Sequence, residues 1–94
     1  MIEHYTYTET TDDTVDVEDG IVYIWNNNGT EWLATLNCPC GCGNKLQLIL
    51  LKNEKPSWSI IKHDNKGITF TPSIHKTSGC KSHFFIREGR VIWC

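Results

Sequence analysis

The chain has 94 residues, of which 39% are hydrophobic and 21% are charged, and its formal net charge is −2. This length is below the roughly 100–150 residues of a typical domain, so we expect a single domain over residues 1–94 and no second core. No window approaches the roughly 18 apolar residues of a membrane helix, and the N-terminus has neither the basic start nor the apolar centre of a secretory signal. We therefore expect a cytoplasmic domain with no membrane segment.

Charge is distributed unevenly along the sequence. Residues 1–44 contain eight acidic and no basic side chains, a net charge of −8, whereas residues 45–94 contain nine basic and three acidic ones, a net charge of +6. One interpretation is that the two halves attract each other within one fold, and the other is a basic C-terminal face that meets an acidic partner. The lysines are too widely spaced for the dense basic stripe of non-specific nucleic-acid binding, which argues against a nucleic-acid partner.

The first half of the chain predicts strands. Residues 1–20 are an acidic N-terminal segment, in which residues 8–19 are interpreted as a loop or a short edge strand. Residues 21–25 are β-branched and aromatic and end at an asparagine–glycine turn. In residues 32–36 and 45–51, apolar side chains alternate with polar ones, which is typical of half-buried strands.

The second half continues this pattern. Residues 57–62 and 68–71 flank a predicted hairpin turn, and residues 84–87 and 90–93 flank Glu88-Gly89 as a final tight hairpin. No segment of ten or more residues shows a clean 3.6-residue period. The predicted fold class is all-β, a small antiparallel sheet or sandwich. We expect its core to use the four tryptophans, which are Trp25, Trp32, Trp58 and Trp93.

Five cysteines without a secretory signal favour metal binding over a disulfide framework. Three of them lie in the run Cys38-Pro39-Cys40-Gly41-Cys42-Gly43, between two predicted strands. Cysteines this close are poor disulfide partners for one another, whereas glycine-containing turns aim thiolates at one point, as in a zinc knuckle. We therefore predict that a zinc knuckle staples the small fold. The alternative is a set of buried thiols that act as small hydrophobic side chains.

A knuckle supplies two or three ligands, so tetrahedral zinc needs more from elsewhere in the chain. Cys80 and His83, spaced Cys-x-x-His, are the natural second half, and Cys94 is a reserve. A closed four-ligand site is structural, whereas three ligands and a water can be catalytic. The pattern leaves open which four of six candidates bind the metal: Cys38, Cys40, Cys42, Cys80, Cys94 and His83.

The polar connection over residues 72–83 is the second candidate site, because small β folds carry function on loops held by their strands. A serine hydroxyl is a weak nucleophile until a base takes its proton, and His83 is the best-placed base for Ser73. Ser73 follows Pro72, which fixes the local backbone. Turn serines usually only bond the backbone, so these residues alone are weak support for catalysis. The other histidines are interpreted as exposed turn residues or as part of a frayed end: His63, His75 and His4.

Three motifs together resemble a bacterial and phage domain family long labelled as unknown in function. They are W-L-A-T-L-N-C-P-C-G-C-G, P-S-I and G-C-K-S-H-F-F-I-R-E-G-R-V-I-W-C, in that order, over residues 32–94, about two thirds of the chain. Members are encoded alone or beside bacterial ubiquitin-like conjugation genes, in Bub-type operons. The resemblance implies a compact zinc-binding β domain that acts as a peptidase of the deubiquitinase kind. Such an enzyme would trim the tail of a ubiquitin-like protein or remove that protein from its conjugates.

Carried over to this sequence, the resemblance implies Ser73 as nucleophile and His83 as its base, with zinc held by Cys38, Cys40, Cys42 and Cys80. Backbone N–H groups of Gly41 and Gly43 are then available as an oxyanion hole. An extended substrate tail would add as a strand to a sheet edge. If His83 instead binds the metal, a zinc-bound water becomes the nucleophile.

Two other functions stay open at the level of sequence. The main alternative is a non-enzymatic, zinc-stabilised binding module for a protein tail or nucleic acid, and the other is a structural part of a larger complex. A binding module would keep its affinity when Ser73 and His83 are changed, whereas a peptidase would lose turnover. The sequence does not specify the substrate, the oligomeric state or the role of residues 1–20.

Overall fold

A computed structural model of the chain describes residues 1–11, 16–76 and 79–94, and within these ranges it contains strands and turns. A four-stranded sheet has the order β1-β2-β3-β4, a two-stranded sheet pairs β5 with β6, and a three-stranded sheet has the order β7-β8-β9. The strands are β1 (Thr6–Thr10), β2 (Ile21–Asn27), β3 (Thr30–Asn37), β4 (Lys45–Ile49), β5 (Ser59–Lys62), β6 (Ile68–Thr71), β7 (Ile74–His75), β8 (His83–Arg87) and β9 (Arg90–Trp93).

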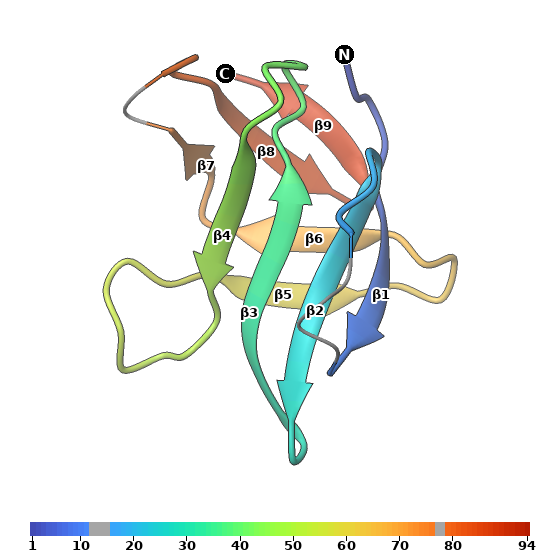
Figure 1. The fold of residues 1–94 in the computed structure, drawn as a ribbon, viewed down its shortest axis with the longest axis vertical. Coiled ribbons are helices and arrows are strands. Elements are labelled where there is room, and N and C mark those ends of the chain that lie inside the picture. Colours follow the sequence, from blue (N-terminus) through green and yellow to red (C-terminus); the bar gives the residue numbers. More distant parts are fainter. Residues whose placement is uncertain (12–15, 77–78) are drawn as a thin grey trace.

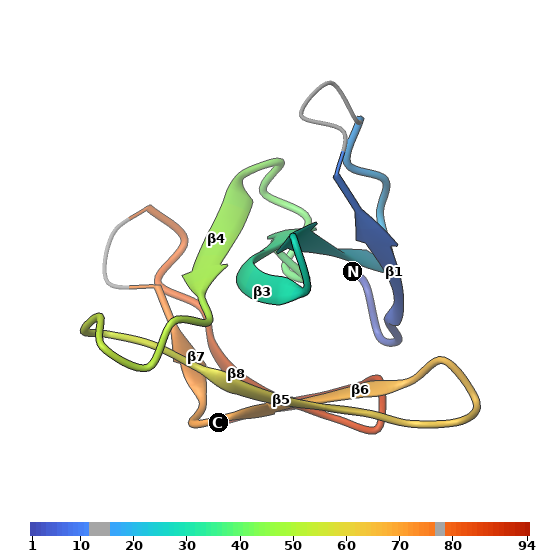
Figure 2. The same cartoon turned by 90° about the horizontal axis from the view of Figure 1, so that it is seen from below.

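The sheets form two layers around one core. Figure 1 shows β1 to β4 in front of β5 and β6, and Figure 2 shows β5 to β8 as a layer below β3 and β4. Each layer contributes the apolar side chains of alternate positions, as expected for strands with one buried face. The core side chains from the four-stranded sheet are Val22, Ile24, Ala34, Leu36, Leu46 and Leu48, and those from the other layer are Ile68, Phe70, Ile74, Phe84 and Ile86.

The all-β prediction is confirmed, and the predicted strands of residues 21–25, 32–36 and 68–71 lie within β2, β3 and β6. The predicted strand of residues 45–51 is shorter, because β4 ends at Ile49. The predicted hairpin of residues 84–93 is present as β8 and β9.

The antiparallel prediction needs one correction, which concerns the acidic N-terminal segment. β1 is an edge strand, as one interpretation of residues 8–19 allowed, but it starts at Thr6 and pairs with β2 in parallel. A parallel neighbour needs a connection back to the same end of the sheet, and the segment between Thr10 and Ile21 makes it. Residues 12–15 of that segment lie outside the described residues.

The prediction of a tryptophan core is wrong for Trp25, Trp32 and Trp93, whereas Trp58 packs against the core. Trp25 and Trp58 are half-buried, whereas Trp32 and Trp93 are 39% and 42% exposed. Trp25 and Trp32 pack against each other near the β2–β3 turn, with ring centroids 6.3 Å apart. Figure 1 shows this hairpin projecting past β5, where the opposite layer no longer covers it.

The N-terminus is held by the tip of the β8–β9 hairpin. The Tyr5 N–H donates to the Gly89 carbonyl at 2.7 Å, and the Val91 N–H donates to the Glu3 carbonyl at 2.9 Å. His4 forms a β-bridge with Arg90, so the prediction of a frayed end is wrong for this residue. Ion pairs of Lys62 with Glu9 and Glu31 join the basic half of the chain to the acidic half.

The described residues include no helix of the length and apolarity needed to cross a bilayer.

Candidate active site and metal centre

The cysteine-rich turn connects β3 to β4. The Cys38 N–H donates to the Asn44 carbonyl at 2.9 Å and closes the turn at its base. Gly41 and Gly43 have φ of +86° and +84°, a conformation that costs glycine little and other residues more. The glycines therefore let the chain reverse within a few residues and bring the sulfur atoms to one side.

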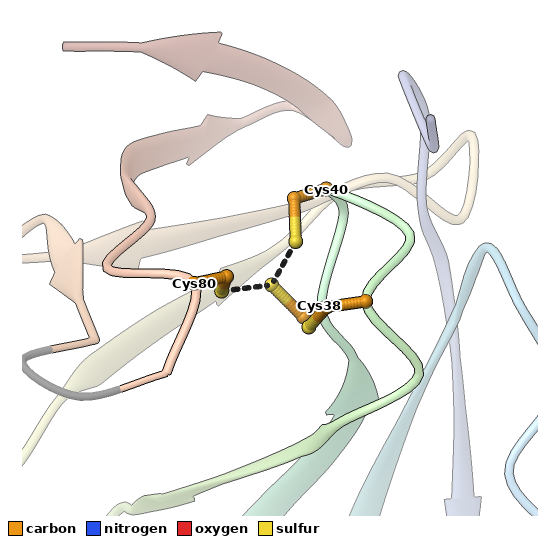
Figure 3. Close-up of side chains that lie close together, drawn as sticks. Cys38, Cys40 and Cys80 are labelled. Atoms are coloured by element: carbon orange, nitrogen blue, oxygen red, sulfur yellow. Dashed lines mark hydrogen bonds between the residues drawn. The ribbon is translucent and has the colours of Figure 1, made fainter.

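Four cysteines meet at this turn, and the fourth arrives from the segment before β8. The Sγ atoms of Cys38, Cys40, Cys42 and Cys80 all lie within 4.8 Å of one another. Cys38 Sγ is 3.4 Å from Cys40 Sγ and 3.6 Å from Cys80 Sγ, and Figure 3 shows it between them. All four are free thiols, so the cluster is a candidate metal site and not a disulfide.

The donor set fits a tetrahedral thiolate site. A Zn–S distance of about 2.3 Å places the sulfurs of a tetrahedron about 3.8 Å apart, close to the separations of Cys38 from Cys40 and Cys80. The cluster comprises four thiols and includes neither His83 nor Cys94. The structure thus brings together four of the six candidate ligands that the sequence left open.

The thiols of this cluster differ in pKa, partly because of hydrogen bonds with Ser82. Burial raises the pKa of the Cys38 thiol to about 12. Hydrogen bonds with Ser82 lower the pKa of Cys80 to about 6, and the Ser82 side chain also lowers the pKa of Cys40. The Ser82 Oγ lies 3.2 Å from Cys80 Sγ and 3.6 Å from Cys38 Sγ. Ser82 is therefore a neighbour of the site that the sequence analysis did not identify.

Ser73 and His83 are brought into direct contact. Ser73 lies between β6 and β7, His83 is the first residue of β8, and Ser73 Oγ is 2.9 Å from His83 Nε2. Both side chains are half-buried. The Trp58 indole N–H donates to the Ser73 carbonyl at 3.3 Å, which ties the serine backbone to the start of β5. This is the geometry of a nucleophile beside a base.

The imidazole of His83 is also covered by a second imidazole. His75 pairs with His83 across β7 and β8, and the two rings are stacked with centroids 4.5 Å apart. His75 was expected to be an exposed turn residue; it is exposed, but it lies on a strand. His63 is half-buried, with its Nε2 2.8 Å from Thr69 Oγ1.

Residues 7–94 match the family described as "Bacterial ubiquitination-like system serine protease (BubE)". The chain belongs to the BubE family. The match covers nearly the whole chain, so the resemblance of residues 32–94 extends back into β1. Comparisons with curated proteins and with solved structures give no match. A BubE protein belongs to a bacterial ubiquitination-like system, so its expected partner class is a ubiquitin-like protein.

The thiol cluster of this BubE domain is connected to the Ser73–His83 pair through residues 80–83. Cys80 is a member of the thiol cluster, Ser82 contacts it, and His83 follows Ser82 directly. Ser82 is buried in the cluster, while the His83 ring contacts Ser73. A cation bound to the cluster would cross-link the cysteine turn to the start of β8.

One predicted feature of the site is not available in the BubE structure. The Gly41 N–H donates to the Cys38 carbonyl at 3.2 Å, which closes the turn. That N–H is committed to the turn, so the predicted use of Gly41 in an oxyanion hole is wrong. The predicted use of the Gly43 N–H stays a prediction.

Proposed function

We propose that this chain is a zinc-containing peptidase that trims or removes a ubiquitin-like protein, with Ser73 as nucleophile and His83 as general base. The observation that carries the proposal is the 2.9 Å contact between Ser73 Oγ and His83 Nε2. Membership of a serine protease family of bacterial ubiquitination-like systems supports the reaction class and the partner.

The chemistry follows from this contact. His83 Nε2 accepts the Ser73 proton as Oγ attacks the scissile carbonyl carbon, and the imidazolium then gives that proton to the departing amine. The products of this step are an acyl ester on Ser73 and a free amine. His83 next deprotonates a water that attacks the ester, and the returning proton restores Ser73. The net reaction is hydrolysis of one amide bond.

Zinc has a structural role in this proposal. Four thiolates occupy all four positions of a tetrahedral ion, so no position is left for a water. Zinc bound there would cross-link the cysteine turn to the segment before β8. It would hold no water that could act as a nucleophile. A small core commonly needs such a staple.

The substrate is an extended tail in this proposal. β7 is an edge strand of its sheet and starts at Ile74, directly after Ser73. A peptide that added to this edge would run beside Ser73 with its main chain held by backbone hydrogen bonds. Recognition of this kind needs no deep pocket, which suits a domain of 94 residues.

The decisive experiment uses Ser73→Ala and a ubiquitin-like protein with a C-terminal extension, taken from a bacterial ubiquitination-like system. We expect the variant to lose cleavage of the extension and labelling by a fluorophosphonate, while metal content and melting temperature stay as in the wild type. Ser59→Ala, at an exposed serine of β5, is the matched control and should stay active. Full cleavage by Ser73→Ala would remove Ser73 from the mechanism.

A further inference from the structure

The outward face of β8 continues from His83 along the strand. Side chains two apart in a strand share a face, so His83, Phe85 and Arg87 point away from the core. The intervening Phe84 and Ile86 are fully buried, which fixes this assignment. Phe85 is half-buried, Arg87 is exposed, and the Arg87 guanidinium lies 4.6 Å from the centre of the Phe85 ring.

β9 completes this face through its register with β8. Ile92 is the partner of Phe85, and Arg90 is the partner of Arg87. Ile92 is 41% exposed, and beside its half-buried partner Phe85 it forms a contiguous apolar patch, the kind of surface that marks interaction sites. The face therefore has the Ser73–His83 pair at one end, an apolar pair in the middle and two arginines at the other end.

The arginine pair has no acidic partner in the part of the chain that the structure describes. Like charges directly opposite each other in a sheet are destabilising, and the ion pairs found among the described residues both involve Lys62. Glu88 lies in the adjacent turn and Glu3 lines the same surface pocket as Arg90, but among the described residues neither forms an ion pair with an arginine. Two unpaired guanidinium groups on one face match a carboxylate from another molecule.

We propose that this outer face, formed by Phe85, Ile92, Arg87 and Arg90, is the docking face for the ubiquitin-like substrate. An apolar side chain of the substrate would pack on Phe85 and Ile92, and an acidic side chain would bind Arg87 and Arg90. At about 3.3 Å per residue, the arginines lie about 13 Å from His83. The proposal rests on the proposed function, because that function places the reacting bond beside His83.

The test measures binding in the Ser73→Ala background, so that it does not depend on turnover. The probe is the ubiquitin-like protein with its C-terminal extension. We expect Arg87→Gln/Arg90→Gln to weaken binding about tenfold, as expected when a central charged contact is lost, and Ile92→Ser to weaken it as well. The matched control, Lys52→Gln/Lys66→Gln, removes two exposed charges elsewhere and should bind as the parent does.

The glutamine variants should fold, since they remove a like-charge pair, and melting temperature with metal content verifies this. Unchanged binding by Arg87→Gln/Arg90→Gln would overturn the docking face, as would an equal loss in the lysine control. Tighter binding of a single-stranded oligonucleotide than of the ubiquitin-like protein, with a steep salt dependence, would assign the face to nucleic acid. Failure of the proposed function is a separate result, because it appears as full cleavage by Ser73→Ala.

Discussion

The imidazole of His75 lies on the imidazole of His83, with the ring centroids 4.5 Å apart and the planes inclined by only 20°. The β7–β8 register places the two residues opposite each other on neighbouring strands. Among the described residues, Ser73 is the hydrogen-bond partner of the His83 ring, and no carboxylate orients its other nitrogen. Besides the hydrogen bond with Ser73, stacking on His75 is therefore a contact that orients the plane of the His83 ring.

This contact makes His75 a positioning residue for the proposed reaction. We expect His75→Ala to lower kcat about 10- to 100-fold, the scale of loss that small misplacements of a catalytic group cause, with little change in KM. His75→Phe keeps a flat ring on His83 and should recover most of kcat. The measurement is the steady-state kinetics of tail cleavage for both variants. Equal losses of kcat in His75→Ala and His75→Phe would show that ring stacking is not how His75 supports the reaction.

The thiol cluster predicts that two exposed cysteines differ in their importance for metal binding and thermal stability. Cys80 is in the cluster and Cys94 is outside it, although both are exposed and free. Cys80→Ser should therefore lose metal and melt at a lower temperature, because the binding free energy of a structural metal is folding free energy. Cys94→Ser should keep the metal and the melting temperature. Elemental analysis beside thermal melting checks both, and equal metal loss in the two variants would contradict the assignment.

His83 lies outside the thiol cluster, so its substitution can test the proposed base without removing a metal ligand. We expect His83→Ala to retain about one equivalent of zinc, as a closed four-thiolate site implies, and to lose tail cleavage. The same elemental analysis, on wild type and variant side by side, decides this. Loss of zinc in His83→Ala would make His83 a ligand and return the nucleophile to a metal-bound water.

Local signals in the sequence were sufficient for much of the fold. The β-branched run of residues 21–25 and the alternation in residues 45–51 predicted strands because burial of one face of a sheet imposes a two-residue period. The run of three cysteines predicted the turn that gathers thiols, because close cysteines with glycines favour a metal over a disulfide. Ser73 and His83 were selected by their residue types and their shared loop.

Other features depend on contacts that no local pattern contains. β1 is parallel to β2, a pairing set by the path of the chain between them and not by either strand alone. β7 has only two residues, too few for any period to be visible, yet it brings His75 onto His83. The exposure of Trp32 depends on how far the β2–β3 hairpin extends past the opposite layer, and composition does not encode that length.

The glycine at the tip of the β8–β9 hairpin leads to a prediction about stability, for which the glycine of the β2–β3 turn is the control. Gly89 and Gly29 both have positive φ, +83° and +85°, in tight turns between strands. A Cβ at Gly89 would clash with the Tyr5 carbonyl oxygen, whereas a Cβ at Gly29 would have no atom within 4 Å. At either site, the left-handed backbone conformation costs alanine about 1–2 kcal/mol of folding free energy.

Only Gly89→Ala adds a clash with the backbone. The clash is with the carbonyl of Tyr5, the residue whose N–H donates to the Gly89 carbonyl. We therefore expect Gly29→Ala to lower the free energy of unfolding by about 1 kcal/mol and Gly89→Ala to lower it by clearly more. Urea unfolding of the metal-loaded protein measures both. Because Gly89 joins β8 to β9, the larger loss should also separate the N-terminal segment from the hairpin, visible as faster amide exchange at Tyr5 and Val91. Equal losses at the two glycines would mean that the hairpin tip and the N-terminal segment do not pack as closely as the structure places them.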